Sequence, residues 1–309
     1  MYTSIVVPLD GSDFGMCALP VTLTLARRSQ ARVHLVHVRE PIVSPEGGPK
    51  VYDGLERGLR ADMTAMAARL ARDADVQVDA VFLEGPAVPT IQRYLEEQSH
   101  DLLVMMTHGR GGLSRWWLGS TADGLVRHTS VPVLLLRQES AWLTDAAEPL
   151  FRRVLVPLDG SSVADQVLDH VMSLATPDMT VYVLLTVLIP GPLGDEHRRE
   201  AVSSYLEDVA DELRRGEALV EVAVVTHPNA AQAILDAAHE QHVDLIALST
   251  QGRGGLSRVM QGSVADEVIR GASVPVLIYR PTHPDAGQLL YQRAAAPEAT
   301  SSRAQSGST

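Results

Sequence analysis

Cysteine, lysine and aromatic residues are rare in this sequence. The first two shortages exclude particular kinds of site, and the third indicates the composition of the core. Cys17 is the only cysteine among 309 residues, which excludes an intrachain disulfide and a cysteine-based zinc cluster. Lys50 is the only lysine, and no Gly-x-x-x-x-Gly-Lys-Ser/Thr segment contains it, so a Walker-type phosphate loop is excluded as well. Aromatic residues make up 4% of the chain, and we therefore expect an aliphatic core.

Long apolar runs and net positive charge are also missing. The longest apolar run, Val181–Ile189, is shorter than the about 20 residues that cross a bilayer. Met1–Asp10 lacks the charged beginning of a signal peptide. A formal net charge of −12 argues against general nucleic-acid binding, because that function needs a basic face. We therefore expect a soluble, cytoplasmic protein with no membrane or nucleic-acid partner.

One stretch of the sequence occurs twice. Asp101–Arg137 reads DLLVMMTHGRGGLSRWWLGSTADGLVRHTSVPVLLLR, and Asp244–Arg280 reads DLIALSTQGRGGLSRVMQGSVADEVIRGASVPVLIYR. Corresponding residues are 143 positions apart (244 − 101), which indicates an internal duplication. In each copy an apolar run of strand length leads into a glycine-rich loop, and in the first copy nine residues separate Gly109 from Gly119. A short helical pattern and a second apolar strand follow.

The glycine-rich loops have the features of an anion-binding site. Glycine lets the backbone approach a ligand closely, and successive free N–H groups form a concave nest for oxyanions. Ser120 and Ser263 stand where a helix should begin, and Asp123 and Asp266, three residues later, complete capping-box patterns. A helix N-terminus carries unpaired N–H groups and about half a positive charge, so loop and helix together suit a phosphate. The alternative is that the serines only cap helices and the glycines only turn the chain.

Strand and helix patterns alternate along both halves, which is typical of a parallel α/β sheet. In the first half we expect strands at Ser4–Leu9, Arg32–Val38, Val76–Leu83, Leu102–Met105 and Val131–Leu136. The helical patterns between them are Asp13–Arg28, Val51–Asp73, Pro86–Gln98 and Thr121–His128. The second half repeats this order. We divide the chain into a first domain at 1–138, a linker at 139–150, a second domain at 151–281 and a disordered tail at 282–309.

Patterns for covalent catalysis and metal binding are weak. Ser12, Asp10 and His108 contain the side chains of a nucleophile, an acid and a base, but no nucleophile-elbow motif surrounds them. His34 and His37 lie three residues apart on one strand, hence on opposite faces, and we expect structural or solvent-facing roles for them. We therefore predict no catalytic residue and no metal site.

The combined pattern resembles the universal stress protein family in its tandem-domain form. The matching features are the glycine loops, the GPA segment Gly85–Ala87, and PLDGS at Pro8–Ser12 and Pro157–Ser161. The resemblance covers about Tyr2–Arg137 and Phe151–Arg280. It implies two Rossmann-like domains of the adenine nucleotide alpha hydrolase-like type, each a five-stranded parallel sheet in the order 3-2-1-4-5 with helices on both faces. In such sheets ligands bind at the carboxyl ends of the strands where the order reverses.

The resemblance also implies an adenine-nucleotide site in each half. In the ATP-binding branch the pattern is Gly-x-x-Gly, nine residues, then Gly-Ser/Thr, and here Met106 and Ser249 replace the first glycine. The implied contacts of the first site are Pro8, Asp10, Val38, Met106, His108, Gly109, Arg110, Gly119, Ser120 and Thr121. Those of the second site are Pro157, Asp159, Val187, Ser249, Gly252, Arg253, Gly262, Ser263 and Val264.

Two details bear on the choice between these sites. The aspartate and the valine are 28 residues apart in both halves (38 − 10 and 187 − 159), which supports the register. Thr121 adds a hydroxyl group where the second copy has Val264, which favours the first site. For Asp10, a role as a turn residue alone stays open.

The implied function is ATP binding in one or both domains by a stress-response sensor or regulator, with an unidentified protein partner. Two alternatives stay open. One is slow ATP hydrolysis with Mg²⁺ on the phosphates, and the other is a scaffold of the same fold that binds no nucleotide, which the replaced glycines favour. In the implied strand order Val131–Leu136 and Val274–Tyr279 are apolar sheet edges, and such edges need a partner. We therefore expect the two domains to pair along them as a built-in pseudo-dimer, and we expect copies of the chain to form a homo-oligomer.

Overall fold

A computed structural model describes residues 1–40, 52–107, 118–137, 150–175, 179–191, 195–250 and 263–281. The strands within these ranges are β1 (Ser4–Pro8), β2 (Arg32–Arg39), β3 (Val78–Glu84), β4 (Leu102–Met106), β5 (Val133–Leu136), β6 (Arg153–Pro157), β7 (Val181–Leu188), β8 (Leu219–Thr226), β9 (Leu245–Ser249) and β10 (Val276–Tyr279). The helices are α1 (Asp13–Met16), α2 (Leu19–Ser29), α3 (Tyr52–Ala74), α4 (Ala87–Glu97), α5 (Ser120–His128), α6 (Ser162–Asp165), α7 (Val167–Leu174), α8 (Asp195–Arg215), α9 (Ala230–Glu240) and α10 (Ser263–Gly271).

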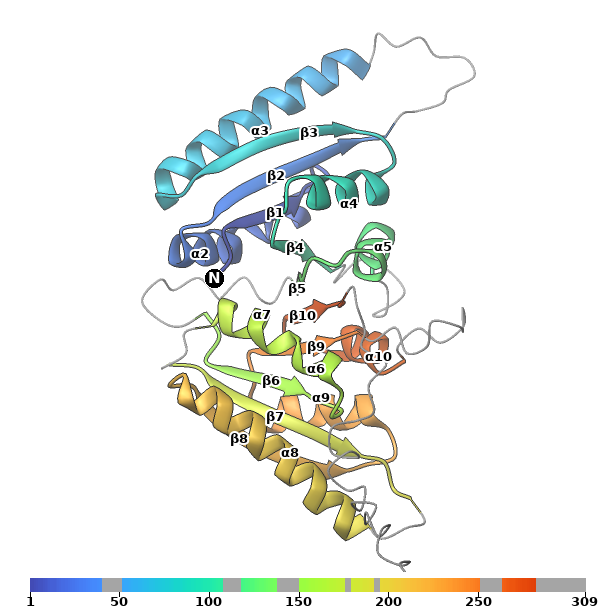
Figure 1. Cartoon of the computed structure of the whole chain (residues 1–309). Helices are drawn as coiled ribbons and strands as arrows, with labels where there is room; N and C mark the ends of the chain where they lie inside the picture. The colour runs from blue at the N-terminus through green and yellow to red at the C-terminus, as the bar shows by residue number, and fades with distance from the viewer. Residues whose placement is uncertain are drawn as a thin grey trace, which may run out of the picture.

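The strands form one ten-stranded sheet in the order β3-β2-β1-β4-β5-β10-β9-β6-β7-β8 (Figure 1). Each half has the expected order 3-2-1-4-5, and its strands are parallel. The halves meet where β5 and β10 pair antiparallel, with Leu134 opposite Leu277. This confirms the predicted pairing of the last strands, and it joins two domains into one continuous sheet.

Two hydrophobic layers cover the two faces of this sheet, and each layer runs through both halves. Side chains alternate along β1, so that Ile5 and Val7 belong to one layer and Val6 to the other. Figure 1 shows α2, α3, α7 and α8 on one face and α4, α5, α9 and α10 on the other, as the members of the two clusters require. The helices on both faces confirm the predicted fold class.

The helix expected at Asp13–Arg28 is interrupted, which corrects the sequence-based prediction. Helix α1 ends at Met16, and α2 begins at Leu19 with Pro20 in its first turn. In a continuous helix the backbone N–H of residue 20 would donate to the carbonyl of Met16. Pro20 has no N–H group, so it cannot make this hydrogen bond. The second half has the same interruption at Gln166 without a proline, so the proline is not required for it.

Side chains from both halves also meet beside the β5–β10 pair. Arg127 of α5 lies 3.5 Å from Asp266 of α10, and the Arg137 guanidinium donates to the carbonyl of Ile269 at 2.8 Å. On the opposite face the Tyr2 hydroxyl donates to the His170 carbonyl at 3.2 Å. The predicted tail and the predicted linker, apart from residue 150, lie outside the described residues, so the proposed domain boundaries stay predictions.

Candidate functional site

The turn after β1 is built around the carboxylate of Asp10. Its Oδ1 accepts from the Ser12 backbone N–H at 2.9 Å and from the Ser12 hydroxyl at 2.5 Å. Ser12 is the N-cap of α1, and its Oγ accepts from the Gly15 N–H at 3.2 Å. Gly11 has φ +84°, a conformation that glycine adopts with little strain. Oδ1 of Asp10 therefore holds the turn, while the residue as a whole faces the cavity described below.

The same turn occurs after β6 in the second half. Oδ1 of Asp159 accepts from the Ser161 N–H at 3.0 Å and from its hydroxyl at 2.5 Å. Each turn is also tied to the neighbouring strand by a side chain from a matching position. His37 Nδ1 donates to the Leu9 carbonyl at 2.9 Å, and the Thr186 hydroxyl donates to the Leu158 carbonyl at 2.8 Å. His37 thus has a structural role, in agreement with the sequence-based expectation.

A cavity of about 190 Å³ lies at the carboxyl ends of β1 and β4 in the first half, where the strand order reverses. Seven of the predicted site residues line it together, although they come from four separate segments of the chain: Pro8, Asp10, Val38, Met106, Gly119, Ser120 and Thr121. The cavity combines a carboxylate, the N-terminus of α5 and apolar walls. An amphiphilic ligand with an apolar ring and an anionic group would match this arrangement.

Further cavity-lining residues were not predicted as site residues from the sequence. They are Leu9, Phe14, Gly15, Val36, Ala87, Ile91, Met105 and Ala122. A two-residue period along β2 places Val36 on the same face as Val38, so that part of the lining was available from the strand pattern. The part from α4 depends on how that helix packs, and no local pattern of the sequence contains that information.

The first turn of α5 differs from the predicted capping box. Gly119 is the N-cap, no side chain caps the helix, and Ser120 is already its first residue. Asp123 instead accepts from Arg127, one helical turn later, at 2.8 Å through each of two guanidinium nitrogens. This hydrogen bond is the largest cause of the lowered pKa of Asp123. The capping-box prediction for α5 is therefore wrong, while the residue before α10, which begins at Ser263, lies outside the described residues, so the second box stays a prediction.

In a capping box the serine hydroxyl and the aspartate carboxylate accept hydrogen bonds from backbone N–H groups at the start of the helix. Because Gly119 takes the capping position and Asp123 bonds to Arg127, neither side chain is used in this way. The Ser120 residue lines the cavity instead.

The structure describes only some of the predicted site residues of the second half. Ser249 ends β9, and its Oγ is shielded from solvent without a hydrogen-bond partner among the described residues. Val264 is 39% exposed at the position where Thr121 lines the first cavity. His108, Gly109, Arg110, Gly252, Arg253 and Gly262 lie outside the described residues, so their part in a site stays a prediction.

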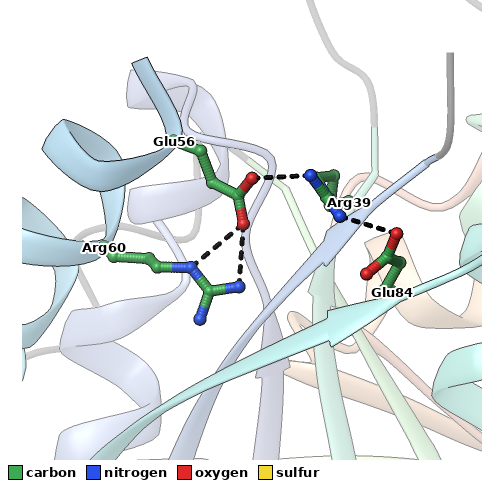
Figure 2. Close-up of polar contacts among 4 residues, drawn as sticks. All are labelled: Arg39, Glu56, Arg60 and Glu84. Carbon is green, nitrogen blue, oxygen red and sulfur yellow. Dashed lines mark hydrogen bonds and ion pairs between the residues drawn. The ribbon is translucent and has the colours of Figure 1, made fainter. Parts of the chain in front are cut away.

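A group of charged side chains fixes the end of β2 at Arg39, the residue that follows the cavity-lining Val38. Arg39 bonds to Glu56 of α3 at 2.8 Å and to Glu84 of β3 at 2.6 Å, and Arg60 adds a second guanidinium on Glu56 (Figure 2). The hydrogen bond from Arg60, together with Arg39, lowers the pKa of Glu56. These contacts connect β2, β3 and α3 at one end of the sheet.

The next residue, Glu40, connects the end of β2 to α4. Its Oε1 accepts from the N–H of Ala87, the first residue of α4, at 2.9 Å. Pro86, the N-cap residue, provides no side-chain acceptor of its own. Because Ala87 also lines the cavity, the Glu40 carboxylate stabilises a helix end that forms part of the cavity wall.

His34, the histidine expected to be structural, belongs to a partly buried polar cluster at the opposite end of the first half. Its Nδ1 lies 3.1 Å from the Tyr94 hydroxyl, and its ring centroid lies 4.6 Å from that of His100. His100 Nδ1 lies 2.5 Å from the Ser4 hydroxyl. Burial, with a smaller effect of His34, lowers the pKa of His100 to about 4. The cluster is therefore neutral at physiological pH.

Comparison with known proteins places this chain in a family. The model of the universal stress protein family matches residues 1–137 and 150–280. The chain belongs to the universal stress protein family. Universal stress protein Rv2005c of Mycobacterium tuberculosis is 27% identical over 292 residues, which cover 89% of this chain and 96% of that protein. A universal stress protein of Mycolicibacterium smegmatis is 26% identical over 292 residues, covering 90% of this chain and 97% of the relative.

Solved structures agree with the tandem architecture. The crystal structure of a universal stress protein from Archaeoglobus fulgidus has a TM-score of 0.71 at 20% identity and covers 90% of this chain and 98% of its own. That of a Pseudomonas aeruginosa protein has a TM-score of 0.61 at 16% identity, with coverages of 91% and 94%. At these identities the likeness shows the fold, and it confirms the fold implied by the sequence motifs.

Two further findings concern the part of the chain that the structure describes. None of its helices has both the length and the apolar composition to cross a membrane. Its histidine, cysteine, aspartate and glutamate side chains form no group of three or more that could hold a metal ion.

Proposed function

We propose that this universal stress protein binds an adenine nucleotide, ATP, in the cavity of its first half, and that binding regulates a stress response through a protein partner. One observation carries the proposal: Asp10, the start of α5 and the apolar residues Val36 and Val38 surround one cavity at the switch point of the sheet. Open α/β sheets bind their ligands at this place.

The parts of the cavity suit different parts of a nucleotide. The N–H groups at the start of α5, around Ser120 and Thr121, favour phosphate oxygens. The aliphatic wall favours the apolar faces of a base, and the carboxylate of Asp10 accepts from hydroxyl or amino groups. Met106 lines the cavity in place of the family's glycine and is 8% exposed, so it occupies space that glycine would leave open.

Equilibrium binding of ATP to the whole chain, measured by titration calorimetry and thermal unfolding, tests the proposal. A ligand at 100 times its dissociation constant stabilises the folded state by about 2.7 kcal/mol. Asp10→Asn keeps the Oδ1 acceptor that holds the turn but removes the charge, so we expect weaker binding with little loss of stability. Asp159→Asn is the matched control, because it makes the same change in the same turn of the second half. Absence of ATP binding by the unmodified chain would contradict the proposal.

The two alternatives predict different results in the same samples. Phosphate release that requires Mg²⁺ would support slow hydrolysis. Lack of any nucleotide effect in the unmodified chain, together with ATP binding by Met106→Gly, would support a scaffold whose cavity Met106 has closed to nucleotides.

Association between copies of the chain is a separate part of the proposal. Within the described sheet β5 and β10 pair with each other, so the outer strands are β3 and β8. A homo-oligomer must therefore use surfaces other than the β5–β10 pair. Light scattering of the eluted protein measures the mass directly, and a mass of one chain at all concentrations would contradict this part.

A further inference from the structure

The turns after β1 and β6 share one backbone design but differ in the side chains that they carry. Ser12 Oγ accepts from Gly15 N–H at 3.2 Å, and Ser161 Oγ accepts from Ala164 N–H at 3.2 Å, so α1 and α6 begin alike. With the register of 149 positions (163 − 14), Phe14 corresponds to Val163. The duplicated turn therefore carries an aromatic residue in one half and an aliphatic one in the other.

Phe14 lies in the wall of the proposed nucleotide cavity. The chain has three phenylalanines, and the other two have different roles. Phe151 is fully buried, and the ring of Phe82 lies beneath the Arg60 guanidinium at 4.7 Å. Among the described residues that line the cavity, Phe14 is the only aromatic one, and Val36, Val38 and Ile91 belong to its aliphatic part.

The position of Phe14 is fixed by the same contacts that fix Asp10. Asp10 holds Ser12, and Ser12 caps the helix that carries Phe14 as its second residue. A side chain on a preorganised backbone loses little conformational entropy on binding a ligand. A planar aromatic ring presents a face on which a flat nucleobase can stack, whereas a branched aliphatic side chain presents none.

We propose that Phe14 is a specificity-determining residue of the first cavity, which contacts the base of the bound nucleotide and selects ligands with an aromatic base. The inference rests on the proposed function, because it concerns the same cavity. The second half has Val163 at this position, and we infer that its turn does not provide the same selection. Phe14 acts through binding of the base and takes no part in a chemical step.

Titration of ATP into the whole chain and three variants tests this inference. Phe14→Leu removes the ring and keeps most of the volume, Phe14→Val introduces the residue of the second half, and Phe14→Tyr keeps the ring. Thermal unfolding without ligand confirms that each variant is folded. The second measurement is the ultraviolet difference spectrum of bound ATP, because the absorbance of adenine falls when its ring stacks.

We expect Phe14→Leu and Phe14→Val to weaken ATP binding by about fivefold to tenfold, as loss of one stacking contact predicts. Both should reduce the absorbance change, while Phe14→Tyr should bind like the unmodified chain. Unchanged ATP affinity in Phe14→Leu, or equal weakening in Phe14→Tyr, would overturn the inference and leave the proposed function intact. An unmodified chain that binds no ATP would overturn both.

Discussion

The two halves of this protein agree in their strand order and in the turns at the carboxyl ends of the strands, but they differ in their buried polar groups. In the first half the buried His100 packs against the partly buried rings of His34 and Tyr94. The corresponding positions of the second half carry only apolar residues, namely Val183, Ala237 and Val243. The duplicated core thus tolerates either a hydrogen-bonded polar cluster or an aliphatic one at the same place.

The second half has a buried polar pair of its own on the other face of the sheet. The Tyr205 hydroxyl donates to Asp165, whose counterpart in the first half is Met16. Burial, with smaller effects of Asp159 and Glu212, raises the pKa of Asp165 to about 6. Between about pH 4 and 6 the folded state therefore binds more protons at Asp165 than the unfolded state does, so this group stabilises the second half more as the pH falls. His34 and His100 of the first half have lowered pKa values, so they stabilise the folded state less as the pH falls.

The substitution with the largest expected effect lies in the strand pair that joins the halves. Leu134 and Leu277 are both 0% exposed and face each other across β5 and β10. Leu134→Lys buries an unpaired charge there, and we expect a loss of at least about 3 kcal/mol or failure to fold. Leu134→Ala should cost about 2 to 5 kcal/mol. Denaturant unfolding and elution volume measure both variants.

The control for this change is Leu219→Lys, which lies on the outer strand β8 and is 49% exposed. It should change the stability by less than about 0.5 kcal/mol. Equal stability and equal elution volume for Leu134→Lys and the unmodified chain would contradict the observed joining of the halves.

The second prediction uses the histidine cluster, which only the first half contains at these positions. Because the pKa of His100 is about 4 in the folded chain against 6.5 in a model peptide, the unfolded state takes up the proton first as the pH falls. The stabilisation is complete above about pH 6.5 and is lost as the pH falls to about 4. Urea unfolding at a series of pH values measures this slope.

Burial is the largest cause of both lowered histidine pKa values, and the charged side chains around the cluster shift these pKa values in both directions. Asp79 raises the pKa of His34 and Arg32 lowers it, while Asp101 raises the pKa of His100. The double variant His34→Val/His100→Val copies the residues of the second half and should flatten the slope between pH 6.5 and 4. A slope that is the same in both proteins would refute the assignment to these histidines.

The third prediction concerns a contact that both halves share. Asp101 accepts from the backbone N–H groups of Thr3 and Ser4 at 2.7 and 2.9 Å, and Asp244 accepts from those of Arg152 and Arg153 at 2.8 and 3.0 Å. Replacing either aspartate by alanine leaves two backbone N–H groups without their carboxylate acceptor. The free energy of unfolding of each variant should therefore fall by about 1 to 3 kcal/mol.

Denaturant unfolding should give similar losses for Asp101→Ala and Asp244→Ala, because the contact is duplicated. Asp208→Ala on an exposed part of α8 is the control, with an expected change under about 0.5 kcal/mol. A loss in one half alone would show that the two contacts are not equivalent in energy.

The smallest expected effect is at the ion pair between the halves. Arg127 contacts Asp123 of its own helix and Asp266 of α10, and all three side chains remain partly exposed. Arg127→Ala should therefore cost at most about 1 kcal/mol, and high salt should reduce the loss. Unfolding at low and high salt measures both statements, and a loss above about 2 kcal/mol would contradict the view that this pair is weak.

Sequence patterns located the strands to within about two residues, because period-two alternation and turn residues mark their ends locally. The resemblance to the universal stress protein family implied seven residues of the cavity, and the turn after β1 and the glycine loop after β4 had pointed to the same edge of the sheet. The capping box at Ser120 failed for a local reason, because Gly119 takes the cap and Ser120 becomes the first residue of α5. Phe14 was missed because its place in the cavity wall depends on how α1 packs beside β1 and β4, and its position in the predicted helix does not contain that information.

The sequence by itself determined the duplication, the alternation of strands and helices, and the family to which the chain belongs. The duplication and the alternation are properties of local order along the chain, and the family follows from the resemblance of its motifs. Only the tertiary structure decided that β5 and β10 pair antiparallel with Leu134 opposite Leu277, that Arg127 meets Asp266, and that Phe14 faces the same cavity as Asp10. Such contacts join residues far apart in the chain, and they depend on how whole elements pack, which spacing does not record.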